Sequence, residues 1–245
     1  LMDDRLRAKG LVATRRDGLG SAVIFEALAA GDIDAYVEYT GTIWTNQMRR
    51  TDAVPREQVL SEVAAWLKDR HGIVTVGGLG FENAYALAMT KKRATEAGIN
   101  SIGDLARRAP ALSIAGDYEF FGRPEWKSIR DAYGLSFRQQ RQMQAEFMYP
   151  AVAAGEIDVI SAYTSDGRVA QFGLQVLDDP KHAIPPYDAI LLVSPKRASD
   201  RAFVDALRPL IGKISVDVMR EANRRAGEGA SPEVAARWLA EKIGR

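Results

Sequence analysis

Two stretches of the sequence share one pattern. Residues 28–40 read LAAGDIDAYVEYT and residues 152–164 read VAAGEIDVISAYT, with the same spacing from glycine to the final tyrosine. Each copy predicts the end of a helix, a glycine cap, a short strand and a Tyr-Thr pair at the carboxyl end of that strand. Because the copies lie about half a chain apart, they indicate two lobes of related topology, since a tandem array would repeat at a shorter period.

Segments typical of strands and helices alternate along the whole chain. The predicted strands are Leu11–Arg16, Ile33–Glu38, Ile73–Val76, Tyr85–Met89, Leu112–Ala115, Val159–Ala162, Leu174–Leu177 and Ala189–Val193. The predicted helices are Ser21–Ala30, Pro55–Arg70, Ser101–Arg107 (with Ser101 as its N-cap), Asp200–Ile211 and Pro232–Lys242. A glycine-rich turn is expected at Gly77–Gly80. This alternation predicts an α/β fold with mostly parallel sheets.

The composition is that of an ordinary globular protein, with 47% hydrophobic and 27% charged residues among 245. The 33 basic and 32 acidic residues are well mixed and leave a net charge of +1. This balance argues against a nucleic-acid-binding surface, which would need a basic patch. The chain has no cysteine, which excludes disulfides, thiol nucleophiles and cysteine-based metal sites.

Tyrosines lie at the edges of the strand-like segments. In open α/β sheets ligands bind outside the carboxyl ends of strands, so the repeated pattern predicts that Tyr39 and Tyr163 border a binding site. The alternative is that each tyrosine caps the core of its lobe. Tyr85 and Tyr187 lie at similar edges, and four such rings can form a box. A quaternary ammonium has no N–H donor, so a protein binds it by cation–π contact, at about 0.5–2 kcal/mol for each ring face.

Residues for catalysis are sparse. The two histidines, His71 and His182, have no partner at the spacing of a metal site or a catalytic triad. The stretch Gly18–Ser21 does not match a phosphate-binding loop, and helix capping by Ser21 is favoured over a local anion site. We therefore expect no enzymatic activity, no cofactor and no metal.

Several motifs, in order along almost the whole chain, resemble the glycine betaine/choline-binding proteins of osmoprotectant ABC transporters. They are Gly18–Ser21, Phe25–Leu28, Gly31–Asp34, Glu38–Thr42, Gly80–Ala88, Phe120–Pro124, Tyr133–Leu135, Ala162–Gly167 and Pro185–Ala189. The resemblance implies a type II periplasmic-binding-protein fold with a ligand cleft between two lobes. Lobe I would comprise residues 1–84 plus 189–245 and lobe II residues 85–188. The hinge would cross near Asn83–Ala86 and Tyr187–Ile190.

The resemblance also implies which residues bind the ligand. The expected set is Tyr39, Thr40, Asn83, Tyr85, Phe120, Arg123, Tyr163 and Tyr187. The tyrosines would cage the cation, and Arg123 would bind a ligand carboxylate through its planar guanidinium. Asn83 stands where the family usually has an acidic residue, and Glu82 is shifted by one position. In an extended chain, the side chain of Glu82 would then point away from the site.

The implied function is capture of a quaternary-ammonium solute such as glycine betaine or choline for an ABC importer, in the periplasm or another extracytoplasmic space. Phe81-Glu82-Asn83 and Asp117–Phe121 resemble relatives in which the binding domain is fused to the permease, so permease subunits are the expected protein partners. One alternative is that the same cleft binds carnitine, proline betaine or an amino acid. A second is the effector domain of a transcriptional regulator, although no DNA-binding module is visible.

Overall fold

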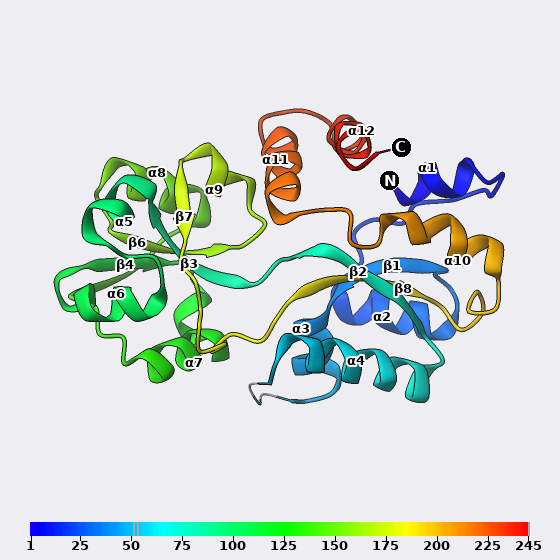
Figure 1. Cartoon of the computed structure of the whole chain (residues 1–245), viewed down its shortest axis with the longest axis horizontal. Coiled ribbons are helices and arrows are strands. Elements are labelled where there is room, and N and C mark those ends of the chain that lie inside the picture. The colour runs from blue at the N-terminus through cyan, green and yellow to red at the C-terminus, as the bar shows by residue number, and fades with distance from the viewer. Residues whose placement is uncertain (51, 53, 245) are drawn as a thin grey trace. The chain divides into compact units, whose positions relative to one another are not determined.

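The chain folds into two compact units, shown in Figure 1 with the colour running from the N-terminus to the C-terminus. The computed structural model describes residues 1–50, 52 and 54–244. Unit 1 consists of Leu1–Glu82, Pro186–Met219 and Ala230–Arg245, and unit 2 consists of Asn83–Pro185 and Arg220–Gly229. The predicted lobe bounds stay a prediction, and they differ from these units at residues 83–84, 186–188 and 220–229.

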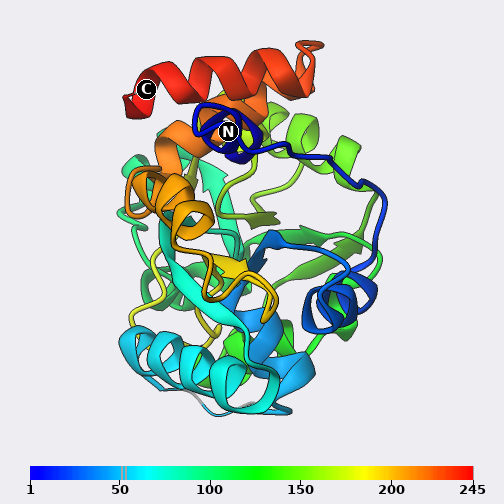
Figure 2. The same ribbon diagram turned by 90° about the vertical axis from the view of Figure 1, so that its right-hand side faces the viewer.

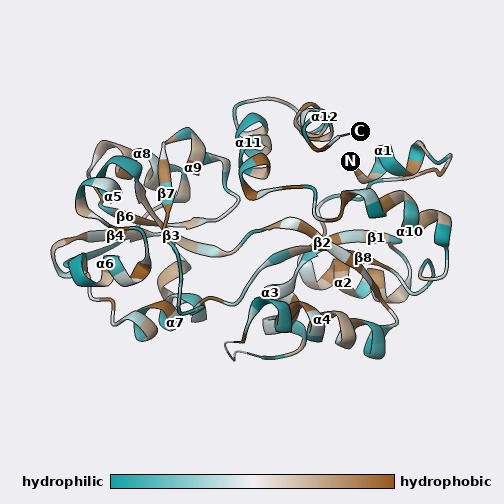
Figure 3. Ribbon diagram, in the orientation of Figure 1, coloured by the Kyte–Doolittle hydropathy of each residue, from teal (hydrophilic) through white to brown (hydrophobic). Residues whose placement is uncertain are grey.

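The sheet of unit 1 has three strands in the order β1-β8-β2. These strands are β1 (Ala35–Tyr39), β2 (Val74–Glu82) and β8 (Asp188–Val193), and β8 pairs antiparallel with both neighbours. Ile190 and Leu192 of β8 pack in one buried cluster with Phe25 and Leu67 from the covering helices. The apolar strand β8 and the mixed polar and apolar bands of α4 can be followed in Figure 3.

The helices of unit 1 agree with most of the predicted ones. They are α1 (Met2–Arg7), α2 (Ser21–Ala30), α3 (Thr40–Thr42) with a π-helical continuation at Ile43–Gln47, α4 (Arg56–His71), α10 (Arg201–Leu207) with a 3-10 turn at Arg208–Leu210, and α12 (Pro232–Ile243). The terminal helices α1 and α12 are neighbours and cross one another (Figure 2). Arg5 of α1 donates a hydrogen bond to the carbonyl of Gly244, which follows α12. No helix within the described ranges is long and apolar enough to cross a membrane.

Two local predictions for unit 1 are wrong. The predicted strand Leu11–Arg16, all of it within the described chain, has no helix or strand, and Val12 is 93% exposed, so its apolar residues cover no core. The predicted turn Gly77–Gly80 lies inside β2, which is bulged there against β8. Gly80 has φ of 113°, and a Cβ at this position would lie 2.8 Å from the carbonyl oxygen of Ile214. The glycine therefore serves a close backbone approach within a strand and not a reversal of the chain.

The sheet of unit 2 has five strands in the order β5-β4-β6-β3-β7. They are β3 (Tyr85–Thr90), β4 (Ser113–Gly116), β5 (Gln139–Gln142), β6 (Val159–Tyr163) and β7 (Leu174–Val176). Strand β4 runs parallel to β5 and β6, whereas β3 runs antiparallel to β6 and β7. With the all-antiparallel sheet of unit 1, this shows that the prediction of mostly parallel sheets is wrong. Strand–helix alternation did not fix the direction of strands such as β3 and β8, which enter their sheets directly from the other unit.

The helices of unit 2 are α5 (Lys91–Ala97), α6 (Ile102–Arg108), α7 (Pro124–Tyr133), α8 (Ala145–Ala154) and α9 (Gly167–Gln171), with 3-10 turns at Ala109–Ala111 and Phe120–Gly122. The predicted cap of α6 is confirmed, since Ser101 and Asp104 form a reciprocal capping box. The core of this unit contains Tyr149 and Val152 of α8 together with Ile160 of β6.

Helix α11 (Val216–Gly227) is divided between the two units, and its first turn, up to Met219, belongs to unit 1. Its residues from Arg220 onward are part of unit 2, where they pack on the segment that follows β6. Arg220 donates to the carbonyl of Thr164 at 2.5 Å, and Asn223 donates to the carbonyl of Ser165 at 2.8 Å. A Cβ on Gly167 would lie 2.2 Å from the backbone nitrogen of Arg224, so only glycine allows α11 to come this close.

The repeated sequence pattern corresponds to repeated structure, as predicted. Helix α2 ends at Gly31 with φ of 80° before β1, and α8 ends at Gly155 with φ of 79° before β6. Tyr39 and Tyr163 are the last residues of these two strands. Each unit thus contains one helix–glycine–strand element that delivers a tyrosine to the end of a strand.

Candidate functional site

Tyr85 and Tyr163 form an aromatic pair in unit 2. They lie opposite one another in the antiparallel register of β3 and β6, and their ring centroids are 4.5 Å apart. Directly opposed residues on one face of a sheet have close Cβ atoms, so this register brings the rings together. Burial raises the pKa of Tyr85 and of Tyr163, and a side-chain hydrogen bond links the two residues. Both phenols are therefore neutral at physiological pH.

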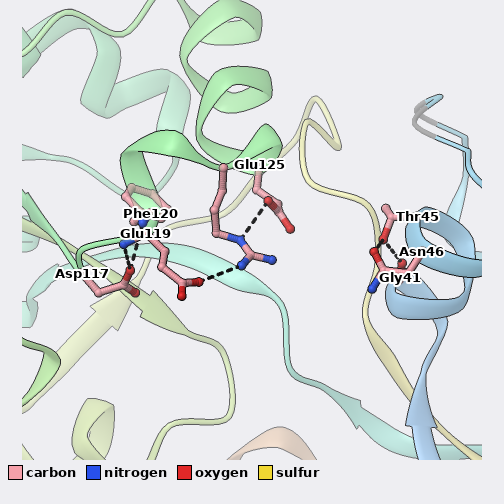
Figure 4. Close-up of polar contacts among 8 residues, drawn as sticks. Gly41, Thr45, Asn46, Asp117, Glu119, Phe120 and Glu125 are labelled. Carbon is pink, nitrogen blue, oxygen red and sulfur yellow. Dashed lines mark hydrogen bonds and ion pairs between the residues drawn. The ribbon is translucent and has the colours of Figure 1, made fainter. Parts of the chain in front are cut away.

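Phe120 extends the pair into an aromatic cluster. Its ring centroid lies 5.6 Å from that of Tyr85, and Phe121 and Trp126 pack behind it with centroids 5.4 Å away. Asp117 fixes the turn that carries Phe120, because its Oδ1 accepts hydrogen bonds from the backbone N–H groups of Glu119 and Phe120, each at 2.9 Å (Figure 4). Phe120 is fully buried, so its ring packs against Tyr85 in a fixed position.

Arg123 lies over the same ring. Its Cζ is 5.0 Å from the ring centroid of Tyr85, its Nε is 3.3 Å from Glu125 and its Nη1 is 3.3 Å from Glu119 (Figure 4). Burial alone would lower the pKa of Arg123, but the hydrogen bond and charge of Glu125 outweigh it and raise that pKa. The sequence predicts Arg123 at the site but not its two acidic partners. No helix is predicted around Arg123, so the spacing of Glu119 and Glu125 from it does not indicate an ion pair.

Asn83 holds the chain next to Tyr163. Its Oδ1 accepts a hydrogen bond from the Ser165 hydroxyl at 2.7 Å, and the backbone N–H of Ala84 donates to the Thr164 hydroxyl at 3.0 Å. With α11 on its other side, the segment after β6 is thus fixed from two directions. The sequence did not indicate a role for Arg220 and Asn223, because the segment that they hold lies more than fifty residues earlier in the chain.

In unit 1, Thr40 fixes the segment around Tyr187. Its hydroxyl donates to the carbonyl of Pro186 at 2.8 Å and accepts from the backbone N–H of Asp188 at 3.0 Å. Thr40 is completely buried. A Cβ on Gly41 would lie 2.7 Å from the ring of Tyr187, so the ring rests directly on this glycine. Thr40 and Gly41 therefore set the place of Tyr187, and a direct ligand contact by Thr40 stays a prediction.

Glu38 supports the other tyrosine of unit 1. This buried carboxylate accepts hydrogen bonds from the backbone N–H of Tyr39 at 2.8 Å, from the Ser21 hydroxyl at 3.0 Å and from the Tyr36 hydroxyl at 3.3 Å. Burial raises the pKa of Glu38 above its ordinary value of 4.5, and these hydrogen bonds offset only part of that rise. Ser21 thus serves a buried carboxylate rather than its own helix, whose N-cap is Gly20 without a side-chain cap bond.

The strand ends at the boundary of unit 1 are charged. Glu82 lies opposite Asp188 in the register of β2 and β8, and Arg56 forms an ion pair with Asp188. The charge of Glu82 also acts on Arg56. Glu82 therefore belongs to the electrostatics of unit 1, whereas Asn83 begins unit 2.

The eight predicted ligand-binding residues fall into two sets. Unit 1 contains Tyr39, Thr40 and Tyr187, and unit 2 contains Asn83, Tyr85, Phe120, Arg123 and Tyr163. Within unit 2, Tyr85 contacts Phe120, Arg123 and Tyr163. Within the described part of the chain, no group of three or more histidine, aspartate or glutamate side chains could hold a metal ion.

Two α/β units, each built on its own sheet, are the plan of a type II substrate-binding protein. A family model described as OpuAC, the substrate binding domain of the ABC-type glycine betaine transport system, matches residues 1–241. The chain belongs to this family, and both the resemblance stated from the sequence and the predicted fold class are confirmed.

Individual relatives agree with this assignment. The chain is 32% identical over 255 residues to a glycine-betaine-binding protein of Pseudomonas aeruginosa, covering 96% of this chain and 80% of that protein. It is 29% identical over 234 residues to the ergothioneine transport permease/ergothioneine binding protein EgtU of Helicobacter pylori, covering 93% of this chain but only 41% of that protein. A crystal structure described as a glycine betaine/carnitine/choline ABC transporter matches with a TM-score of 0.92 at 27% identity, covering 98% and 92% of the two chains.

The role of Thr40 can be tested by Thr40→Val, which keeps the shape of the side chain and removes its hydroxyl. The Asp188 amide loses its acceptor, so we expect a loss of about 1–3 kcal/mol in the free energy of unfolding. Urea denaturation measures this loss, and hydrogen exchange should show faster exchange at the Asp188 amide. Thr40→Ser keeps the hydroxyl and should retain most of the protection. Equal protection of Asp188 in the wild type and Thr40→Val would contradict this assignment.

Glu38 predicts a pH dependence of stability. Its folded-state pKa is raised, so the folded chain binds this proton more tightly than the unfolded chain does. The stabilisation is therefore complete at low pH and is lost as the pH rises from about 4.5 through the raised value. Glu38→Gln cannot ionise. The free energy of unfolding of the wild type, measured against this variant, should fall as the pH rises above about 4.5. A constant or rising difference would show that Glu38 is not the group responsible.

Proposed function

We propose that this chain captures a small quaternary-ammonium solute for an ABC importer, with glycine betaine and choline as the leading candidates. The observation that carries the proposal is the Tyr85–Tyr163 pair with Phe120 beside it. Neutral aromatic rings attract a methylated cation that no hydrogen-bond acceptor can recognise. Tyr39 and Tyr187 of unit 1 would complete the cage when the two units close on the ligand. Hinge closure near Asn83–Ala86 and Tyr187–Ile190 is part of this proposal.

Arg123 favours a ligand that also carries a carboxylate. Glycine betaine, carnitine and ergothioneine share a trimethylammonium group and a carboxylate, whereas choline has only the first. These compounds occur in the descriptions of the similar proteins. A guanidinium above Tyr85 places a carboxylate-binding group next to the ring that would hold the cation. Proline betaine carries a dimethylated quaternary ring nitrogen and a carboxylate, so it belongs to the same class of methylated zwitterions.

The protein partners follow from the same proposal. The binding domain would deliver its ligand to permease subunits on the extracytoplasmic side of the membrane and would catalyse no reaction. The permease named with the Helicobacter pylori relative supports a fused arrangement, since the present chain spans 41% of that protein. Binding of an ordinary amino acid in the same site is the alternative, with Asn83 and Thr40 as acceptors. Thr40 is already hydrogen-bonded to the Pro186 carbonyl and Asn83 to the Ser165 hydroxyl. These groups are therefore less available to bind a primary ammonium, which favours the methylated cation.

Calorimetric titration with glycine betaine, choline, carnitine, proline betaine, ergothioneine and glycine tests this function. We expect at least one methylated ammonium compound to bind and glycine not to bind, because glycine offers a primary ammonium that needs several converging acceptors. Binding of glycine alone would support the amino-acid alternative. Binding of none of the six compounds would contradict the proposed function.

Substitution of Tyr163 tests whether the ring face holds the cation. Tyr163→Ala should weaken binding by about 1–2 kcal/mol, since one ring face is lost, whereas Tyr163→Phe should change affinity much less. Phe147→Ala removes an exposed aromatic side chain from α8 and serves as the control, with no change expected. Equal losses in Tyr163→Phe and Tyr163→Ala would assign the binding to the hydroxyl and not to the ring.

A further inference from the structure

We propose that Glu119 competes with the carboxylate of the ligand for Arg123 and thereby sets the selectivity of the site between zwitterionic and purely cationic ligands. The inference rests on the proposed function, because it concerns the same site. Glu119 is not among the residues that the sequence identified as ligand-binding. It would act as an internal anion that a zwitterion must displace and that choline can leave in place.

The geometry of Arg123 distinguishes its two carboxylate partners. Glu125, in the first turn of α7, pairs with Nε and has a side chain only 8% exposed. Glu119 pairs with Nη1 and has a side chain 78% exposed. Separating Arg123 from Glu125 would break a charge-assisted contact in a desolvated position, which is expensive. Glu119 can rehydrate at little cost, since exposed ion pairs contribute little.

The backbone around Glu119 allows this exchange. Its N–H donates to Asp117 at 2.9 Å, in the turn that also fixes Phe120. The side chain can therefore swing away from Arg123 without moving the aromatic cluster. The guanidinium stays over Tyr85, held by Glu125, and its Nη1 then becomes available to a ligand carboxylate.

The local charges favour a cation as the chain stands. Glu119 and Glu125 pair with Arg123, and Asp117 lies on the same turn as Glu119. Burial is the main cause that raises the pKa of Tyr163, and the charges of Asp117 and Glu119 raise it further while Arg123 lowers it. The field of Glu119 therefore reaches the proposed cage ring. A cation gains from this negative charge, and a ligand carboxylate meets both its repulsion and its competition.

The decisive variant is Glu119→Gln, which keeps the size of the side chain and removes its charge. The dissociation constants of glycine betaine and choline are measured by calorimetry with the whole 245-residue chain at fixed ionic strength. Glycine betaine should bind about two- to fivefold more tightly, the range for release of one exposed ion pair. Choline should bind equally well or more weakly, so the affinity ratio moves toward the zwitterion.

Two further variants isolate the mechanism. In the Arg123→Ala background, glycine betaine should lose its advantage from Glu119→Gln, because the group for which the two carboxylates compete is gone. Glu96→Gln removes an exposed carboxylate from a comparable pair, that of Lys92 and Glu96 on α5, and should leave both affinities unchanged.

The outcomes separate this inference from the proposed function. A ratio that shifts in Glu119→Gln, but not in the Arg123→Ala background or in Glu96→Gln, supports competition at Arg123. An unchanged ratio in Glu119→Gln, with both ligands still bound, overturns the competition and leaves the proposed function intact. The same shift with and without Arg123 also overturns it, because Glu119 would then act only as a remote charge. Failure of the wild type to bind either compound overturns this inference, and failure to bind any of the six titrated compounds overturns the proposed function as well.

Discussion

The antiparallel pairing of Tyr85 with Tyr163 is the contact on which the candidate site of unit 2 depends. One tyrosine begins β3 and the other ends β6, so a single register places both rings at one edge of the sheet. Phe120 and Arg123 then pack against Tyr85. The register holds because the chain beyond Tyr163 is fixed on both sides, by the Asn83–Ser165 hydrogen bond and by helix α11. The aromatic faces are thus held in place by contacts within the protein.

Unit 1 reaches a comparable result by different chemistry. Polar groups set the places of Tyr39 and Tyr187. Glu38 holds the backbone of Tyr39, and Thr40 holds the main chain on both sides of Tyr187. Glu38 and Thr40 are both buried, so the loss of one of their hydrogen bonds would leave a polar group without a partner, which is costly. The repeated sequence pattern therefore gives one topology with two kinds of support.

The sequence predicted the features that depend on local rules. The glycine caps, helices α2 and α4, the capping box of α6 and the strand-end tyrosines follow from short-range patterns, and the family resemblance was sound. The predicted direction of the strands was wrong, because β3 and β8 pair with segments distant in the chain. The support of the site was missed for the same reason. Glu125 near Arg123 and Asn223 below Ser165 have ordinary sequence surroundings, and only tertiary packing gives them a role.

The family resemblance predicts an acidic residue at position 83, where this chain has Asn83. Glu82, one residue earlier, ends β2 opposite Asp188, and both carboxylates lie in the field of Arg56. Its charge is therefore balanced within unit 1. Asn83 is neutral and binds Ser165, so it adds no charge to the aromatic pair. The negative charge near Tyr85 and Tyr163 comes instead from Asp117 and Glu119, which lie on the turn that carries Phe120. Glu119 lies on an exposed turn, whereas Glu82 is held by strand pairing, so the carboxylate of Glu119 can move at a lower cost than that of Glu82.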